Sequence, residues 1–333
     1  MSLFLVVKLF FAFIVAFLTT FALVPLLIAL AYRLGVMDVP DGAVKNHATA
    51  TPYFGGLAVY TGFLAGIALV LPIENRIMFL LIGTTLLLLI GLIDDLVVLE
   101  PYQKFTGQLL ACLSFLKAGL FLKEQFFRDY LWIAVPVSML WFLTIINGFN
   151  LIDVMDGLAT TVALGATVAY LVIALLFGQY TAASLLVAFA GALLAFLWYN
   201  KPRAKMYLGD TGSLFIGGFL ACIPFLFPWS ALHTYGFLMP ALILSIPLFE
   251  VTSLVVLRTA KGIRFYRPSP DHFCHYLQRW GWSVPEILVL VAGVSLCILV
   301  SALLFLSHTL TMTALLVVAL ILFATWLRLT FKN

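Results

Sequence analysis

Residues 147–158 read NGFNLIDVMDGL and directly follow the apolar run of residues 130–146. They place Asn147, Asn150, Asp153 and Asp156 three residues apart. On a helix, a three-residue step traces an inclined ridge, so neighbouring members of such a series point into one region. Helix capping would explain one or two of the four, but amides and carboxylates so close to a bilayer are costly and indicate a functional site. The stretch therefore predicts a membrane-spanning helix that ends in a polar site.

Apolar runs of this kind fill the chain. Of its 333 residues, 64% are hydrophobic and 10% are charged, and the mean hydropathy is +1.15. So few charges could not keep a protein of this length dissolved. The sequence therefore predicts an all-α integral membrane protein with a single transmembrane domain over residues 1–333. About eleven runs are long enough to span a bilayer, over residues 3–32, 54–72, 77–98, 105–122, 130–146, 157–177, 180–199, 213–227, 236–257, 284–306 and 309–329.

The Lys and Arg residues indicate the orientation, because cytoplasmic loops carry an excess of them. With the N-terminus outside, all but five of the 18 basic residues fall on the cytoplasmic side. The exceptions are Lys8, Arg76, Lys117, Lys123 and Arg128. We therefore expect an outside N-terminus and a cytoplasmic C-terminus. The basic residues form no single long patch and accompany no nucleic-acid-binding motif, so no nucleic-acid partner is expected.

The acidic residues gather where the expected helices meet the cytoplasm. Those on this face are Asp38, Asp41, Asp94, Asp95, Asp153, Asp156, Asp210 and Asp271. Glu250 alone is expected deep in a span, either as a buried hydrogen-bonding group or as a site residue. A transporter would place its polar groups near the membrane midplane, often on broken helices in repeated halves. The one-sided arrangement favours an enzyme at the membrane surface over a transporter of lipid-linked intermediates.

Adjacent carboxylates end the apolar run in residues 91–108, GLIDDLVVLEPYQKFTGQ. Neighbouring side chains on a helix point about 100° apart, so Asp94 and Asp95 are expected to serve different partners. We expect one to hold a divalent metal and the other to meet an acceptor phosphate or its proton. Lys104 would add positive charge near the same anion. The alternative is a solvated pair at a helix C-terminus, where carboxylates oppose the helix dipole.

Residues 200–218, NKPRAKMYLGDTGSLFIGG, place three basic residues ahead of Asp210 and a helix start behind it. This arrangement offers a metal-binding carboxylate beside the backbone N–H groups of a helix N-terminus, which suit a phosphate. An N-cap role for Asp210 or Ser213 is compatible with the same pattern.

Two further loops carry cations. In residues 38–56, Lys45 and His47 are donors suited to phosphate, and the glycine pair at 55–56 lets backbone approach a ligand or a neighbouring helix closely. In residues 258–283, Arg264 and Arg267 suit a diphosphate. His272 and His275 follow there, three residues apart, and are expected to face the same way.

Two kinds of metal site are compatible with these residues. A zinc site would use Asp271, His272, Cys274 and His275, but no second ligand pair follows and none of the four cysteines forms a CxxC pair. An oxygen-only carboxylate set that retains waters suits Mg²⁺, with Mn²⁺ as the alternative ion. No Walker A, GxGxxG or GxSxG motif supports nucleotide hydrolysis, redox chemistry or serine hydrolysis. The inner loops together favour a divalent cation and a phosphate-rich substrate.

Five segments, each in an expected inner loop, carry a family resemblance. They are DVPDGAVKNHATATPYFGG (38–56), GLIDDL (91–96) with Lys104, NGFNLIDVMDGL (147–158), LGDTGSLFIGG (208–218) and SPDHFCHYL (269–277) with the GWS that follows. In this order they resemble the polyprenyl-phosphate N-acetylhexosamine-1-phosphate transferases. That family, glycosyltransferase family 4, includes undecaprenyl-phosphate GlcNAc-1-phosphate transferases and phospho-MurNAc-pentapeptide translocases.

The resemblance implies a reaction and a compartment. It implies Mg²⁺-dependent transfer of a sugar-1-phosphate from a UDP-N-acetylhexosamine to undecaprenyl phosphate, with release of UMP, as the start of a lipid-linked cell-envelope glycan. The enzyme would be a multi-pass protein of the bacterial cytoplasmic membrane with its active site on the cytoplasmic face. A homodimer is compatible with this resemblance.

The resemblance also implies roles for residues. Asp94 and Asp95 are similar to the paired aspartates at the acceptor phosphate, where one acts as base, and Asp210 and Asp95 are the implied metal ligands. Asp153 and Asp156 are carried over as catalytic residues that contact the nucleotide and support the metal. The implied substrate-binding residues are Lys45, His47, Lys104, Asn147, Asn150, Arg264, Arg267, His272 and His275.

One position departs from the family pattern. The family's motif reads His-x-His-His, or three consecutive His in the translocases, whereas this chain has Cys274 in the third position, between Phe273 and His275. The DVPD and TPYFGG segments resemble the GlcNAc branch, and GWS before Pro285 resembles the translocases. We expect a GlcNAc-1-phosphate transferase, with a phospho-MurNAc-pentapeptide transferase as the alternative. Cys274 also raises the alternative of a non-catalytic polyprenyl-phosphate binder.

Overall fold

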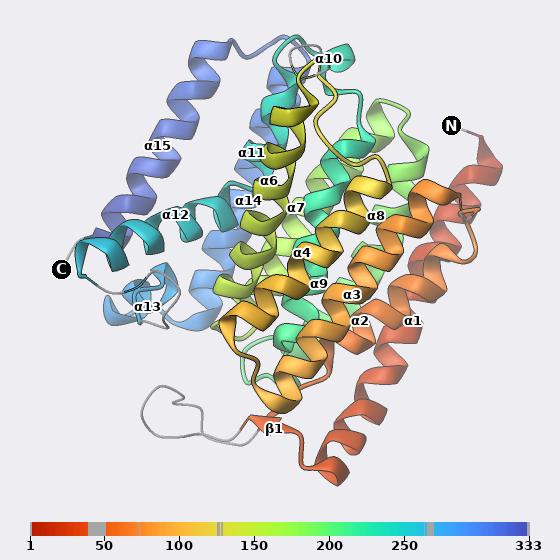
Figure 1. Cartoon of the computed structure of the whole chain (residues 1–333), viewed down its shortest axis with the longest axis vertical. Coiled ribbons are helices and arrows are strands. Elements are labelled where there is room, and N and C mark those ends of the chain that lie inside the picture. The colour runs from red at the N-terminus through yellow and green to blue at the C-terminus, as the bar shows by residue number, and fades with distance from the viewer. Residues whose placement is uncertain are drawn as a thin grey trace.

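The structure is a computed structural model of the chain. It describes residues 2–38, 51–72, 74–124, 127, 129–262, 264 and 270–331. Within these ranges the chain folds into a bundle of α-helices (Figure 1). The only sheet in the same ranges is an antiparallel pairing of two residues each, β1 (Met37–Asp38) with β2 (Thr51–Pro52).

The helices differ widely in length along the chain. In the first part of the chain they are α1 (Leu3–Leu34), α2 (Gly55–Ile67), α3 (Asn75–Val97), α4 (Pro101–Lys117), α6 (Leu131–Ile152), α7 (Leu158–Leu176), α8 (Tyr180–Asn200) and α9 (Gly209–Cys222). In the last part they are α10 (Trp229–Leu232), α11 (Met239–Ile243), α12 (Ser245–Ala260), α13 (Phe273–Arg279), α14 (Val284–Leu306) and α15 (Met312–Phe331), with 3₁₀ turns η1 (Ile223–Leu226) and η2 (Gly236–Leu238).

Every expected span coincides with a helical segment, but not all of these segments are equally long. By length and composition, seven of the described helices can cross a membrane, or eight if a bent pair counts as one span. The helix α2 and residues 312–328 of α15 are apolar but shorter. The described part of the chain is therefore that of a polytopic helical membrane protein.

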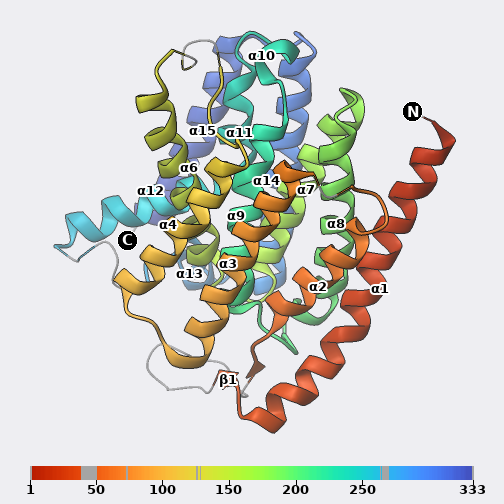
Figure 2. The ribbon, with the colours of Figure 1, turned by 45° about the vertical axis from the view of Figure 1, so that its right-hand side comes forward.

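The span expected over residues 236–257 is broken, which corrects that prediction. Residues 236–243 and α12 meet at a bend of 67°, and α12 runs across the direction of the neighbouring helices (Figures 1 and 2). Pro247 explains the break, because it has no N–H to donate to the carbonyl of Ile243, and its ring would clash with that carbonyl in a continuous helix. The sequence analysis read only the hydropathy of this segment and overlooked its proline.

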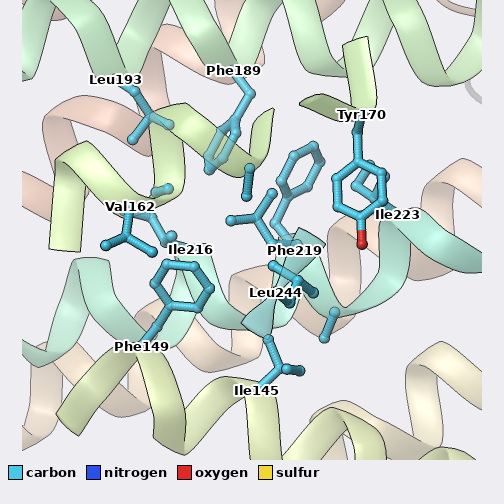
Figure 3. Close-up of a cluster of buried hydrophobic side chains, with 14 of the residues drawn as sticks. Ile145, Phe149, Val162, Tyr170, Phe189, Leu193, Ile216, Phe219, Ile223 and Leu244 are labelled. Carbon is cyan, nitrogen blue, oxygen red and sulfur yellow. The ribbon is translucent and has the colours of Figure 1, made fainter. Parts of the chain in front are cut away.

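The helix α9 lies at the centre of the bundle. All its residues except Asp210 are buried, and side chains of α6, α7 and α8 pack around it, including Phe149, Tyr170 and Phe189 (Figure 3). The expected close approach at the glycine pair 55–56 is confirmed: a Cβ on Gly56 would lie 2.2 Å from the backbone nitrogen of Gly212. Close packing of α2 on α9 thus fixes the position of the residues that begin α9.

The polar ends of several helices meet at one end of the bundle. The end of α3, the start of α4, the end of α6 and the helix α13 lie toward the lower end in Figure 1, whereas α10 and the N-terminus lie toward the upper end. Residues far apart in the sequence are brought together at this lower end.

Candidate active site

Asp95, in the last turn of α3, holds the start of α9. Its Oδ1 accepts the N–H of Asp210 at 2.9 Å, and its Oδ2 accepts the N–H and the hydroxyl of Thr211 at 3.0 and 2.6 Å. The N-cap residue of α9 is Leu208, which has no side-chain acceptor, so Asp95 supplies the cap from another helix. Gly209 has φ +71°, and a Cβ there would lie 2.5 Å from Oδ2 of Asp95, so glycine is required for this approach.

Asp94 faces a different partner, and the expected divergence of the two carboxylates is confirmed. Its Oδ2 lies 2.9 Å from Nζ of Lys104, near the start of α4, and its Oδ1 accepts the N–H of Leu99 at 2.6 Å. The same ammonium group of Lys104 forms an ion pair with Oδ2 of Asp210. One cation therefore joins carboxylates from the end of α3 and the start of α9.

Asn150, in the last turn of α6, completes this cluster. Its Nδ2 donates to Oδ1 of Asp210 at 2.6 Å and to Oγ of Ser213 at 3.0 Å. Its Oδ1 lies 3.4 Å from Nζ of Lys104. Because Asp210 is the one residue of α9 that is not buried, the side chains of α3, α4 and α6 converge on the single accessible position of the central helix.

Asn147 does not reach the carboxylate cluster, and Asp153 and Asp156 follow the end of α6, so the single helical ridge predicted for residues 147–156 is wrong. Asn147 and Gln108 of α4 exchange amide hydrogen bonds of 2.8 and 3.3 Å, and Nδ2 of Asn147 also donates to the carbonyl of Leu143. Gln108 is 1% exposed. The sequence analysis missed Gln108, although it follows Lys104 by four residues and so lies on the same helix face.

Asp153 caps the end of α6 beside the cluster. Burial raises the pKa of this carboxyl well above its usual value, and the negative charges of Asp210, Asp95 and Asp156 raise the pKa further. The raised pKa of Asp153 therefore reflects an excess of negative charge at this end of the bundle. A carboxyl group that shares a site with other carboxylates shows this effect in general.

Asp156 serves the connection between α8 and α9. Its Oδ2 accepts the backbone N–H groups of Arg203 and Ala204, both at 3.0 Å. Arg203 has φ +66°, a conformation that costs free energy for a residue with a side chain. The two hydrogen bonds stabilise the basic segment that leads into Asp210.

The cluster gathers oxygen atoms around one cation. The carboxylates Asp94 and Asp210 converge on one cation, the Lys104 ammonium, and the amide oxygen of Asn150 points at the same atom. Oxygen donors of this kind fit Mg²⁺ better than zinc. Within the described ranges, no three His, Cys, Asp or Glu side chains surround a common metal position. The expectation that Asp95 binds metal stays a prediction, and both of its oxygens already accept hydrogen bonds from α9.

The side chains of the zinc alternative turn to separate partners at the junction of α12 and α13. Asp271 lies 2.6 Å from Nζ of Lys261 and accepts the hydroxyl of Tyr276 at 3.0 Å. Nδ1 of His272 lies 2.9 Å from Oε1 of Glu250. The structure therefore contradicts the zinc alternative. Glu250 was expected either as a buried hydrogen-bonding group or as a site residue. It is fully buried and hydrogen-bonded through Oε1, as the first interpretation predicts.

Cys274, the departure from the family motif, lies in the core beneath α13. It is 0% exposed, and burial raises the pKa of its thiol. His275 instead lines a surface hollow of about 330 Å³ together with Pro270, Gln278 and Arg279. The Cys274 substitution therefore changes the packed side of α13 and leaves its open side intact.

Among the other predicted residues, Arg264, His272 and His275 lie outside the cluster, and Arg264 is exposed on the loop between α12 and α13. Lys45, His47 and Arg267 lie outside the described residues. The ring centroids of His272 and His275 lie 5.7 Å apart. The prediction that the two side chains face the same way is wrong, because His272 turns to Glu250 and His275 lines the surface hollow. Thr211, whose hydroxyl binds Asp95, was missed by the sequence analysis, and its place directly after Asp210 was the available signal.

Bacterial proteins of known class share this sequence over nearly its full length. Residues 77–227 match the family described as glycosyl transferase family 4. The chain is 30% identical to the "Probable undecaprenyl-phosphate N-acetylglucosaminyl 1-phosphate transferase" of Bacillus subtilis, over 94% of this chain and 89% of that protein. It is also 30% identical to the "Phospho-N-acetylmuramoyl-pentapeptide-transferase" of Staphylococcus saprophyticus, over 85% of this chain and 94% of that protein, and 28% identical to the enzyme of the same name from Staphylococcus carnosus.

These relatives and the helical bundle with its carboxylate cluster define a class of membrane-embedded phospho-sugar transferases. The chain belongs to glycosyl transferase family 4. The family resemblance inferred from the five inner-loop segments is thereby confirmed.

Proposed function

We propose that this enzyme transfers N-acetylglucosamine-1-phosphate from UDP-GlcNAc to undecaprenyl phosphate, with Mg²⁺ as cofactor and UMP as the second product. The observation that carries the proposal is the convergence of Asp94, Asp210, Lys104 and Asn150 from four helices on one accessible point. Such a cluster binds a cation and a phosphate together. The similarity to the Bacillus subtilis protein, which covers 94% of this chain, supports this acceptor and donor.

In the proposed reaction an oxygen of the acceptor phosphate attacks the phosphorus that bears the sugar. The phosphoanhydride bond between this phosphorus and the bridging oxygen breaks, and UMP leaves with the bridging oxygen and its negative charge. Mg²⁺, when bound, offsets the negative charge on the donor diphosphate during this displacement. Asp94 and Asp210 are the residues that would hold the ion, and their present convergence on one ammonium supports this assignment.

The other side chains of the cluster position the reactants. Lys104 supplies a positive charge to the acceptor phosphate, and Asn150 fixes the carboxylate of Asp210 by a hydrogen bond of 2.6 Å. Asp95 keeps the start of α9, with Asp210, at a fixed distance from α3. Positioning together with electrostatic stabilisation supplies most of the catalysis in phosphoryl transfer.

The proposed site faces the cytoplasm. Basic residues gather in or beside the connections at the end of the bundle that holds the carboxylates: Lys104, Lys201, Arg203, Lys205 and Lys261. An excess of basic residues marks the cytoplasmic side of a membrane protein. On this side a water-soluble nucleotide sugar can meet a lipid head group whose tail remains in the bilayer.

A second donor is supported by the relatives from Staphylococcus, which are named phospho-N-acetylmuramoyl-pentapeptide transferases. The site cluster alone does not distinguish the donors, because it contacts the parts that they share. We favour GlcNAc because the relative of that name matches more of this chain, 94% against 85%.

The proposal is tested with purified protein, MgCl₂ and undecaprenyl phosphate, offered UDP-GlcNAc, UDP-GalNAc and UDP-MurNAc-pentapeptide separately. UMP release and the lipid-linked product are measured. We expect turnover with UDP-GlcNAc that depends on Mg²⁺. The Asp210→Asn variant should release no UMP and form no lipid-linked product. Turnover with UDP-MurNAc-pentapeptide alone would replace the proposed donor, and no turnover with any of the three donors would overturn the proposed function.

A further inference from the structure

Glu250 is a buried acid that the proposed chemistry does not use. It lies in the second turn of α12, is 0% exposed, and its Oε1 lies 2.9 Å from Nδ1 of His272. His272 is itself only 6% exposed. A buried carboxylate requires a charged or hydrogen-bonding partner, because leaving it unpaired costs several kcal/mol. The two side chains therefore form a pair that links α12 to the segment containing the histidine motif.

A third charged side chain lies near this pair. Arg258, about two turns further along α12, is 3% exposed and interacts electrostatically with both Glu250 and Asp271. From α13, Cys274 contributes a neutral thiol, and His275 lies next to His272. The contact between Oε1 of Glu250 and Nδ1 of His272 is thus enclosed by side chains of both α12 and α13.

The position of His272 at the start of α13 gives the pair a mechanical consequence. His272 is the N-cap residue of α13, and its carbonyl accepts the N–H groups of His275 and Tyr276 at 3.0 and 3.3 Å. The ring of His272 is thus fixed to α12 while its backbone begins α13. One turn later, His275 lines the surface hollow that also contains Arg279.

We propose that Glu250 is a positioning residue for the histidine motif: it holds His272 beneath the surface and thereby sets where α13 presents His275 to the nucleotide-sugar donor. This inference rests on the proposed function for the identity of the donor. The two histidines then have different roles, since His275 meets the donor and His272 connects it to Glu250. A carboxylate that orients a histidine in this way typically changes activity about 10- to 100-fold when it is removed.

The test measures UDP binding in the presence of MgCl₂, and steady-state kinetics, for Glu250→Gln, His272→Ala and the double variant. We expect each single variant to weaken UDP binding and raise KM for the UDP-sugar about tenfold or more, while KM for undecaprenyl phosphate stays unchanged. The double variant is expected to be no worse than His272→Ala, because the two residues act as a unit.

The matched control is Lys261→Met. It removes the neighbouring ion pair between α12 and α13, at 2.6 Å from Asp271, without touching Glu250 or His272. We expect this control to leave UDP binding and both KM values unchanged. If it weakens UDP binding as much as Glu250→Gln, general loosening of the junction explains the effect and the proposal is wrong. Wild-type affinity for UDP in Glu250→Gln, or fully additive losses in the double variant, would also overturn it.

Thermal unfolding separates this inference from the proposed function. His272→Ala leaves Glu250 buried without its partner and should lower the apparent Tm, whereas adding Glu250→Gln should raise it again. This recovery and the loss of UDP binding are expected even if the wild-type protein transfers a sugar other than GlcNAc. If the second substitution fails to restore the Tm of His272→Ala, the two side chains are not a pair and the proposal fails by itself.

Discussion

Two polar regions lie at the same end of this bundle, and they balance their charges differently. In the cluster of α3, α4 and α9, Asp94 and Asp210 pair with a single cation, Lys104, and Asp95 binds the backbone beside Asp210. At the junction of α12 and α13, each acid has its own partner: Lys261 pairs with Asp271, and His272 pairs with Glu250. The first region has an excess of negative charge, and the second is close to balance.

An excess of negative charge, as in the first region, is typical of a site that binds a cation. A balanced set of charges, as in the second region, is typical of a contact that stabilises the fold. Uncompensated carboxylates near one another are unfavourable, so a cluster of them is retained where a cation offsets the charge during function. A balanced buried network has no such requirement and instead fixes the relative position of two elements. Substitution of Asp210 in the first region should therefore reduce turnover with little loss of stability, whereas substitution of His272 in the second should reduce both activity and stability.

The largest effect is expected for Asp210→Asn. The substitution removes a charge at the point where four helices converge, so kcat should fall about 10²- to 10³-fold, as for the loss of one electrostatic contact to a transition state. The apparent Tm in detergent should stay the same or rise, because one of the mutually repelling carboxylates is gone. UMP release and a melting curve on the same preparation check both. A normal kcat, or a clearly lower Tm, would remove the distinction between the two regions.

Asp95→Asn should differ from Asp210→Asn although the two carboxylates are neighbours. Asp95 accepts three hydrogen bonds from the start of α9, and hydrogen bonds to a charged acceptor contribute about 1.5–3 kcal/mol each. The variant should therefore lose stability as well as activity. The measurement is the apparent Tm of Asp95→Asn beside that of Asp94→Asn, whose carboxylate contacts Lys104 and Leu99 and not the backbone of α9. Equal values would show that Asp95 does not anchor α9.

The pH dependence of stability provides a third test of the charge excess. The pKa of Asp153 is raised in the folded state by burial and by its acidic neighbours. Between the unfolded pKa, about 3.9, and the raised folded pKa, the folded state binds more protons, so stability falls as pH increases. Asp153→Asn should abolish this contribution and raise the apparent Tm at neutral pH, but not near pH 4. Melting curves of both proteins across that range, without divalent cations, decide it. An equal difference at every pH would contradict the assigned cause.

The helical bundle and most of the site were predictable because the signals were local. Long apolar runs predicted the helices, and the adjacency of Asp94 and Asp95 predicted their different partners. What the sequence could not provide was the pairing between helices. The contact of Glu250 with His272 joins residues 22 positions apart across a loop, and nothing in the local pattern of α12 indicates it.

The errors have equally specific causes. A hydropathy profile does not register that proline lacks a backbone N–H. The profile therefore showed one continuous apolar run where the structure has a break before Pro247. The spacing of residues 147–156 was correct as a pattern, but α6 ends at Ile152, and only the side chains near that end can reach α9. A ridge argument needs to know where its helix stops, and the sequence leaves such a boundary uncertain by several residues.

The smallest effect on activity is expected for Asn147→Ala, beside a large one for Asn150→Ala. Asn147 binds Gln108, away from the carboxylates, so its loss leaves a buried amide without a partner and should cost about 1–3 kcal/mol of stability while kcat/KM stays unchanged. Asn150 donates to Asp210 at 2.6 Å, and its removal should lower kcat/KM about 10- to 100-fold. The two substitutions remove the same side chain from the same helix. They differ in the partner that is lost, which is Gln108 for Asn147 and Asp210 for Asn150. If Asn147→Ala lowers kcat/KM as much as Asn150→Ala, the active site extends one turn deeper along α6 and includes Gln108.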